Sequence, residues 1–156
     1  MIDTRISSDP DLTDLANDLH DKDVVQLQEI SIRLIERGTE LVSLKDALAS
    51  EVRRLLREGK KVPTDVLERL EAESDEADGH YLDILDAEGA ESSRCLDAFG
   101  KARILMAHCF AAQGEKLSLL DSIYESYVGT QRNPSMLDII RKFAGWPGRV
   151  PEARDD

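Results

Sequence analysis

Leucine recurs at every seventh position along the segment from about residue 23 to residue 58. Ile30 and Leu44 fill the companion position three residues further on, which is the spacing of a coiled-coil seam. Val52 and Leu56 widen the apolar stripe, and this favours a helical bundle over a bare two-stranded coil. The pattern therefore predicts one long helix over 23–58. The five recurring residues are Leu27, Leu34, Leu41, Leu48 and Leu55.

A second long apolar pattern follows a short polar break. Gly59 suits the C-terminal cap of the first helix, and Thr64 suits the N-cap of the next. Apolar residues then recur at spacings of three and four, which predicts a helix over 65–112. The pattern lapses between residues 86 and 94, so we expect either a locally irregular helix or a break near Gly89. A short loop between two long helices places them antiparallel.

Three shorter apolar patterns lie on either side of these two helices. They predict helices over 10–20, 116–128 and 134–144, and the last of these begins with an Asn-Pro pair that suits a cap and first turn. The stretch 145–156 is rich in Pro and Gly and ends in acidic residues, so we expect a flexible tail. A single helical domain over 1–144 follows.

The predicted fold class is therefore all-α: a helical bundle built on an antiparallel hairpin of the two long helices, with the short helices flanking it. Composition agrees, because aromatic residues make up only 4% of the 156 residues. Sandwiches and barrels need more aromatic and β-branched side chains on their pleated surfaces. One domain of this length can bury a real core.

Nearly all of the excess behind the net charge of −12 lies in two segments, residues 1–23, with seven acids and two bases, and residues 65–91. Residues 65–91 hold eleven acids and one base, Arg69, whereas residues 24–61 hold six acids and eight bases. Such a chain should be repelled by phosphate backbones and by anionic membrane surfaces. The sequence also lacks an apolar run long enough to span a membrane and the basic and apolar start of a secretory signal. We therefore expect a cytoplasmic protein that binds neither nucleic acid nor membranes directly.

No recognisable catalytic motif is present. Cys95 and Cys109, the two cysteines, would lie about 21 Å apart on one helix, too far for a disulfide. They read as small core residues of a reducing compartment. His108 precedes Cys109, but adjacent helix positions point about 100° apart, so the two do not form a catalytic pair. We expect neither a catalytic residue nor a cofactor.

The best metal-ligand candidates are Glu76, His80 and Asp83, which share one face of the second predicted helix. Metal sites in bundles draw ligands from facing helices, and the first long helix offers no histidine. A solvated acidic face is the simpler interpretation of these residues. A metal-binding or enzymatic bundle is therefore kept as an alternative hypothesis.

Three functions from different classes stay open. The first is a non-enzymatic adaptor or chaperone that binds a basic partner or a partner helix; the second is the metal-binding or enzymatic bundle; the third is a purely structural coiled-coil homo-oligomer held by the leucine seam. The acidic run can also be no more than a solvated helix face, and a homodimer is compatible with the first and third hypotheses. The residues we predict to bind the partner are Glu68, Glu71, Asp75 and Asp78 for electrostatic attraction, and Tyr124, Tyr127 and Trp146 as apolar anchors.

Overall fold

The computed structural model describes residues 4–145, and every regular element in this range is helical. The predicted all-α helical bundle is thus confirmed. Gly145 is the one residue of the predicted tail that is described; Trp146 and the rest of the tail lie outside the described residues. The α helices are α1 (Arg5–Ser8), α2 (Ala16–His20), α3 (Val24–Leu41), α4 (Ala47–Arg57), α5 (Thr64–Glu88), α6 (Ser93–Gln113), α7 (Lys116–Gly129) and α8 (Pro134–Ala144), and a 3₁₀ turn, η1 (Thr13–Leu15), precedes α2.

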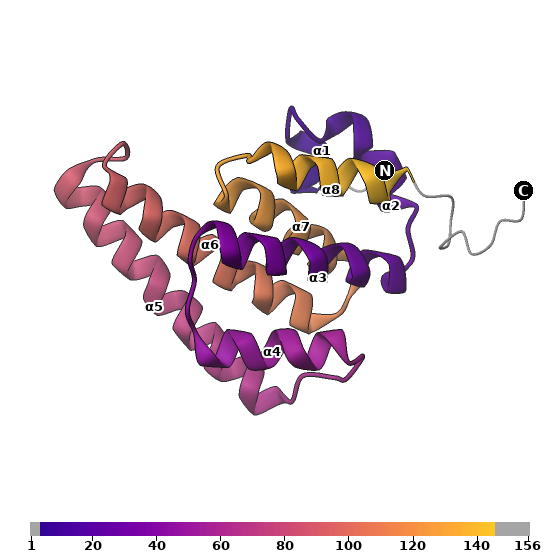
Figure 1. The fold of residues 1–156 in the computed structure, drawn as a ribbon, viewed down its shortest axis with the longest axis horizontal. Coiled ribbons are helices and arrows are strands. Elements are labelled where there is room, and N and C mark those ends of the chain that lie inside the picture. Colours follow the sequence, from indigo (N-terminus) through magenta and orange to yellow (C-terminus); the bar gives the residue numbers. More distant parts are fainter. Residues whose placement is uncertain (1–3, 146–156) are drawn as a thin grey trace, which may run out of the picture.

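Helix α6 lies at the centre of the bundle and packs along both of its neighbours in sequence, α5 and α7 (Figure 1). Helix α3 lies across α6 and α7, and α8 and the N-terminal helices cover the other side of α7. The long antiparallel hairpin of the fold is therefore α5 with α6. The predicted pairing of 23–58 with 65–112 is wrong, because the second of these segments folds back on itself as α5 and α6.

The predicted single helix over 23–58 is wrong, because the chain turns between α3 and α4. Ser43 has a φ of 55°, a left-handed conformation that ends α3, and the Leu44 N–H donates to the Thr39 carbonyl at 3.0 Å. This is the backbone pattern of a helix C-terminal cap. The Oδ1 atom of Asp46 then accepts from the Ala49 N–H at 2.8 Å and caps the start of α4.

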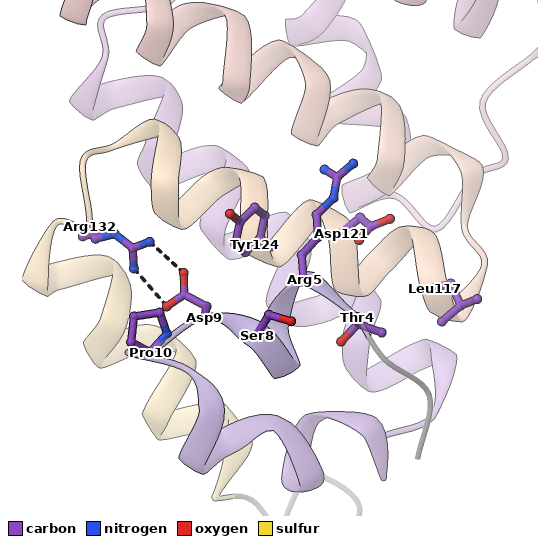
Figure 2. Close-up of a pocket in the computed structure, with 9 residues that line it drawn as sticks. All are labelled: Thr4, Arg5, Ser8, Asp9, Pro10, Leu117, Asp121, Tyr124 and Arg132. Atoms are coloured by element: carbon purple, nitrogen blue, oxygen red, sulfur yellow. Dashed lines mark hydrogen bonds and ion pairs between the residues drawn. The ribbon is translucent and has the colours of Figure 1, made fainter. Parts of the chain in front are cut away.

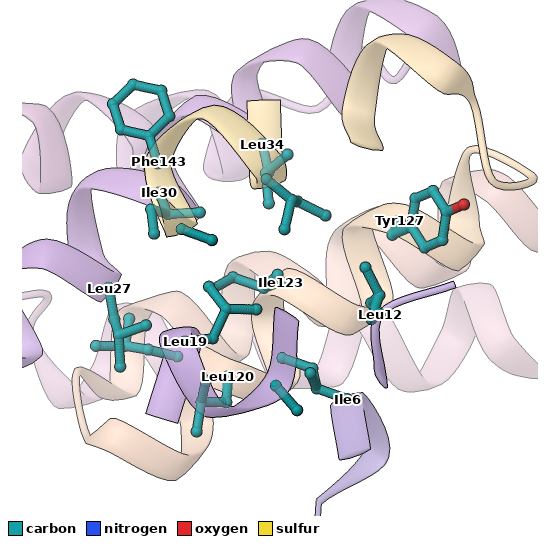
Figure 3. Close-up of a cluster of buried hydrophobic side chains, with 14 of the residues drawn as sticks. Ile6, Leu12, Leu19, Leu27, Ile30, Leu34, Leu120, Ile123, Tyr127 and Phe143 are labelled. Atoms are coloured by element: carbon teal, nitrogen blue, oxygen red, sulfur yellow. The ribbon is translucent and has the colours of Figure 1, made fainter. Parts of the chain in front are cut away.

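The turn divides the leucine seam between two core clusters. Leu27 and Leu34 are fully buried with side chains of α7 and α8 and of the N-terminal helices, including Ile6 and Ile123 (Figure 3). Leu48 and Leu55 are half-buried against a second cluster formed by α4, α5 and α6. The heptad repeat thus marks the buried face of two successive helices rather than one seam.

The predicted second long helix breaks at the position where its pattern lapses. Helix α5 ends at Glu88, and Gly89 has a φ of 87°, a conformation that suits glycine. The Ser92 hydroxyl accepts from the Cys95 N–H at 3.0 Å and caps α6. Helices α7 and α8 lie within a residue or two of their predicted positions. The segment 10–20 forms η1 and α2, and α1 was not predicted.

Candidate functional site

Three of the four acids predicted to bind a partner lie on the exposed face of α5. Glu68, Glu71 and Asp75 are exposed, whereas the opposite face of the helix buries Leu70 and Ile84 against its neighbours. None of the three acids forms an ion pair with another residue of the range 4–145. Because helix positions three and four apart are neighbours, these carboxylates form a continuous acidic stripe.

The fourth acid, Asp78, has a different environment. Its Oδ1 atom accepts from Arg103 Nη2 at 2.5 Å, so it links α5 to α6. Arg103 also pairs with Glu125 of α7 at 3.4 Å and lies over the ring of Phe99. Asp78 therefore belongs to an ion-pair network between helices and is less available to a partner than Glu68, Glu71 or Asp75.

The far end of the α5–α6 hairpin projects beyond the other helices (Figure 1). We call residues 79–99, which form this end, the acidic arm. Its own small core consists of Ile84, Cys95 and Ala98, with Tyr81 packed edge-to-face on Phe99 at a centroid distance of 5.3 Å. So few buried side chains leave apolar groups at the surface of the arm.

Two leucines of the acidic arm are exposed. Leu82 has 52% of its surface accessible and Leu96 has 38%. Leu82 shares a helix face with Asp86, one turn further on, and Asp83 lies beside that face; both acids are exposed. Contact surfaces commonly combine apolar side chains with surrounding charge in this way.

Tyr124 is the one predicted aromatic anchor that the described residues place at the surface. It lines a hollow of about 580 Å³ between the N-terminal segment and α7, together with Arg5 and Arg132 (Figure 2). The same three residues line a second, adjoining hollow of about 760 Å³, which extends towards Phe99. Tyr124 therefore stands between two cavities.

The arginines of these hollows are already paired with carboxylates. Arg132 lies 2.8 Å from Asp9 and 2.9 Å from Asp11, and Arg5 pairs with the buried Glu125. Burial raises the pKa of Glu125, and the nearby Arg103 and Arg5 oppose this effect. An incoming anion would have to compete with these carboxylates, so the hollows are poorly suited to binding anions.

Arg132 is also held by its backbone. Both Gln131 and Arg132 have a φ of 58°, an unfavourable left-handed conformation for residues other than glycine. Arg132 lies over the Tyr127 ring at 5.5 Å and joins the turn between α7 and α8 to the N-terminal segment. The strained turn thus positions Arg132 to hold the N-terminal segment against α7.

Tyr127 is part of the core, with only 2% of its surface accessible. Its hydroxyl donates to Asp11 Oδ2 at 2.8 Å, and burial and this bond raise its pKa to about 12. A partner could reach Tyr127 only if the N-terminal segment moved away. Trp146, the third predicted anchor, lies outside the described residues.

The metal candidates Glu76, His80 and Asp83 are all exposed on α5. Within residues 4–145, no three His, Cys, Asp or Glu side chains come close enough together to hold a metal ion. These three residues lie among the other exposed side chains of α5.

A buried polar cluster that the sequence did not reveal joins α3, α4 and α6. Arg53 Nη1 lies 2.8 Å from His108 Nε2 and 3.3 Å from Thr39 Oγ1. His108 Nδ1 lies 2.7 Å from the Ile104 carbonyl oxygen, so Nδ1 carries the proton and Nε2 accepts from Arg53. Burial, assisted by the Arg53 charge, lowers the His108 pKa to about 4. His108 is therefore a neutral structural residue.

Beside this cluster, the carboxyl groups of Glu73 and Asp46 influence each other's pKa. Glu73 of α5 contacts Asp46, the N-cap of α4; this interaction, followed by burial, raises the Glu73 pKa to about 7. Glu73 Oε1 is buried and receives no N–H or hydroxyl donor from the described residues. A proton shared between the two carboxyls accounts for the raised pKa of Glu73. No sequence pattern indicates this pair, because Asp46 and Glu73 belong to separate helical elements.

The chain matches no protein-family model, and neither the curated proteins nor the solved structures give a significant match. Among the helices described, none has the length and apolar character needed to cross a membrane.

Proposed function

We propose that this chain is a non-enzymatic interaction adaptor, and that the face of α5 and the acidic arm bind a basic segment of a partner protein. The observation that carries the proposal is the exposed acidic stripe of Glu68, Glu71 and Asp75, which has no ion-pair partner among the described residues. It continues along the same helix into the arm, where Leu82 is exposed.

Electrostatics and apolar contact would have different roles in this complex. A stripe of like charges attracts a Lys- or Arg-rich segment from a distance and accelerates encounter, and added salt weakens this attraction. Covering Leu82 and Leu96 then adds hydrophobic stabilisation of about 25 cal/mol per Å² of apolar surface buried. A basic amphipathic helix satisfies both requirements.

The alternative functions have less support. His108 is buried and neutral, and burial raises the Cys109 pKa to about 12, opposite to what activates a nucleophile. The fully buried Leu27 and Leu34 pack inside one chain, which leaves little of the leucine seam for a coiled-coil oligomer.

Two buried free cysteines accord with a reducing compartment, and we propose a cytoplasmic location.

The proposal is tested with a charge-reversal variant that carries Glu68→Lys, Glu71→Lys and Asp75→Lys. Native mass spectrometry and crosslinking of the untagged protein identify the partner, and calorimetry then measures its affinity. We expect the variant to bind the partner at least tenfold more weakly than the unaltered protein. The affinity of the unaltered protein should itself fall as salt is raised.

The matched control carries Asp14→Lys, Asp18→Lys and Asp21→Lys, which make the same charge change at exposed positions near the N-terminus. Its affinity should fall by no more than about threefold, since only long-range charge is altered. Equal losses in the two variants would show that net charge, rather than the α5 face, attracts the partner. Unchanged affinity in the α5 variant would refute the proposal.

A further inference from the structure

An apolar groove with cationic rims lies at the end of the bundle where α3 begins and α4 and α6 end. It has a volume of about 620 Å³. Val25 is the most exposed of its apolar residues, with 77% of its surface accessible, and Val24 beside it has 43%. Leu56 and Val62 are buried in the opposite wall. We call this feature the cationic groove.

The charges around the groove are opposite in sign to the charge of the chain. Arg57, Lys60 and Lys61 line it, and Glu29 is its one acidic lining residue among those described. A neighbouring apolar hollow of about 300 Å³ shares Val25 and Glu29 with it and adds Lys22 and Arg33. Four exposed cations, the buried Lys22 and one carboxylate thus line a continuous apolar strip, in a chain whose net charge is −12. Arg57, Lys60 and Arg33 form ion pairs with Glu36, Glu58 and Glu29. These pairs lie at the surface, where such pairs contribute little, so the cations stay accessible to a second carboxylate, unlike Arg5 and Arg132, which pair with buried acids.

This combination specifies what fits the groove. The exposed valines require an apolar side chain, and the cationic rims require carboxylates on either side of it. The acidic arm meets both requirements, since the exposed Leu82 lies one helical turn from Asp86 and has Asp83 beside it. Figure 1 places the arm at the far side of the molecule from the loop between α4 and α5, so the arm cannot fold back into its own groove.

We propose that the cationic groove binds the acidic arm of a second copy of this chain. The inference rests on the proposed function in that it uses the arm as a docking element. Because arm and groove are different surfaces, the contact is heterologous: it closes if two copies exchange arms, and otherwise it continues head to tail. A basic partner of the arm would compete with this self-association.

The net charge opposes association but acts mainly at long range. At about 0.15 M salt the Debye length is about 8 Å, so repulsion between whole molecules is largely screened while contacts within a few ångströms persist. Self-association should therefore be measurable at that salt concentration and weaken towards about 0.6 M.

The experiment is sedimentation velocity of the full chain over a wide range of concentrations, with two charge-reversal variants. The groove variant carries Lys60→Glu and Lys61→Glu, and the arm variant carries Asp83→Lys and Asp86→Lys. The unaltered chain should increase in mass with concentration, and each variant alone should associate at least tenfold more weakly. An equimolar mixture of the two variants should recover association, because the basic arm of one meets the acidic groove of the other.

The control variant carries Asp14→Lys and Asp18→Lys and should associate like the unaltered chain. Circular dichroism of every variant verifies that it is folded. A monomer at all concentrations, or association that survives both reversals, would overturn the inference; so would a mixture that stays dissociated. A foreign acidic helix that binds the groove of a monomeric chain would also overturn it. Partner binding that depends on α5 in a monomeric chain would leave the proposed function standing, so the two failures are distinguishable.

Discussion

The carbonyl oxygen of Gly129 lies 2.9 Å from the position that a Cβ atom on Gly100 would occupy. Val42 Cγ1 is equally close to that position, so α3, α6 and α7 meet at a point where position 100 has no room for a side chain. Real Cβ atoms do not approach a carbonyl oxygen this closely without displacing it. The central crossing of the bundle therefore depends on this glycine.

We predict that Gly100→Ala destabilises the fold by about 1–3 kcal/mol, because a backbone atom must move to accommodate the methyl group. Gly79→Ala is the matched control: it lies within α5 with nothing near its Cβ position, and alanine should stabilise that helix by about 0.5–1 kcal/mol. Urea unfolding followed by circular dichroism measures both changes. Similar effects of the two substitutions would contradict the close crossing.

The carboxyl pair of Glu73 and Asp46 predicts a stability that depends on pH. In the unfolded chain the Glu73 pKa returns to about 4.5, whereas in the fold it is about 7. The folded state therefore holds a proton that the unfolded state has lost, and its contribution to stability disappears as pH rises through about 7. Glu73→Gln keeps a hydrogen-bond donor beside Asp46 but cannot ionise, so it removes this dependence.

Relative to Glu73→Gln, the unaltered protein should lose on the order of 1 kcal/mol of stability between about pH 5 and pH 8, a value reduced for solvent screening. Urea titrations at several pH values measure the difference. Glu71→Gln on the exposed face of the same helix is the control, and it should leave the pH dependence as it is. A constant difference between the unaltered protein and Glu73→Gln would show that the two carboxyls do not share a proton.

His108 predicts the opposite dependence. Its pKa is about 4 in the fold and about 6.5 when unfolded, so the unfolded state binds a proton first as the solution is acidified. Stability from this group is therefore lost as pH falls from about 6.5 towards 4, by up to about 3 kcal/mol. Between about pH 4.5 and 6.5 the effects of His108 and Glu73 oppose each other.

His108→Gln should remove the loss on acidification, and Glu73→Gln should make that loss steeper by removing the opposing term. The exposed His80→Gln is the control for a change of histidine content. For the unaltered protein and for each variant, unfolding free energies at about pH 7.5, 6 and 5 give the slope of stability against pH. If His108→Gln and His80→Gln had the same slope, His108 would not be a neutral buried histidine.

The helices of this fold were largely predictable, but their arrangement was not. The break at Gly89 had a local signal, because the apolar pattern lapses at a glycine. The turn at Ser43 had none, because this serine lies in the middle of a heptad repeat that continues on both sides of it. The Asp46 cap becomes apparent only once the helix is known to end. Because the chain turns at Ser43, the first predicted long helix is divided and the long hairpin is formed by α5 and α6 instead.

For the candidate site, the acidic stripe could be predicted because exposure of a charged helix face needs no tertiary contact. The tyrosines could not be told apart. Tyr124 and Tyr127 lie three residues apart on α7, and Tyr127 becomes a core residue through Asp11 and Arg132, which come from distant parts of the sequence. The pairing of Glu73 with Asp46 likewise depends on the packing of α4 against α5.

The different surroundings of the two buried cysteines predict that the acidic arm opens independently of the rest of the bundle. Cys95 is buried in the small core of the arm, beside Ile84 and Ala98, whereas Cys109 belongs to the larger cluster formed by α4, α5 and α6. A segment with few buried apolar contacts opens locally at a lower free energy than the whole domain. Cys95 should therefore become accessible through opening of the arm alone, and Cys109 only through wider unfolding.

Thiol labelling of two single-cysteine variants, Cys109→Ala and Cys95→Ala, tests this prediction. In the folded protein Cys95 should react at least tenfold faster than Cys109, and its rate should depend only weakly on urea, since local opening exposes little surface. Rates are compared with those of the same variants unfolded in urea, which corrects for intrinsic reactivity. Equal protection of both thiols, with the same strong urea dependence, would mean that the arm opens only with the entire bundle. In that case the arm would present a rigid docking surface rather than one that adapts to its partner.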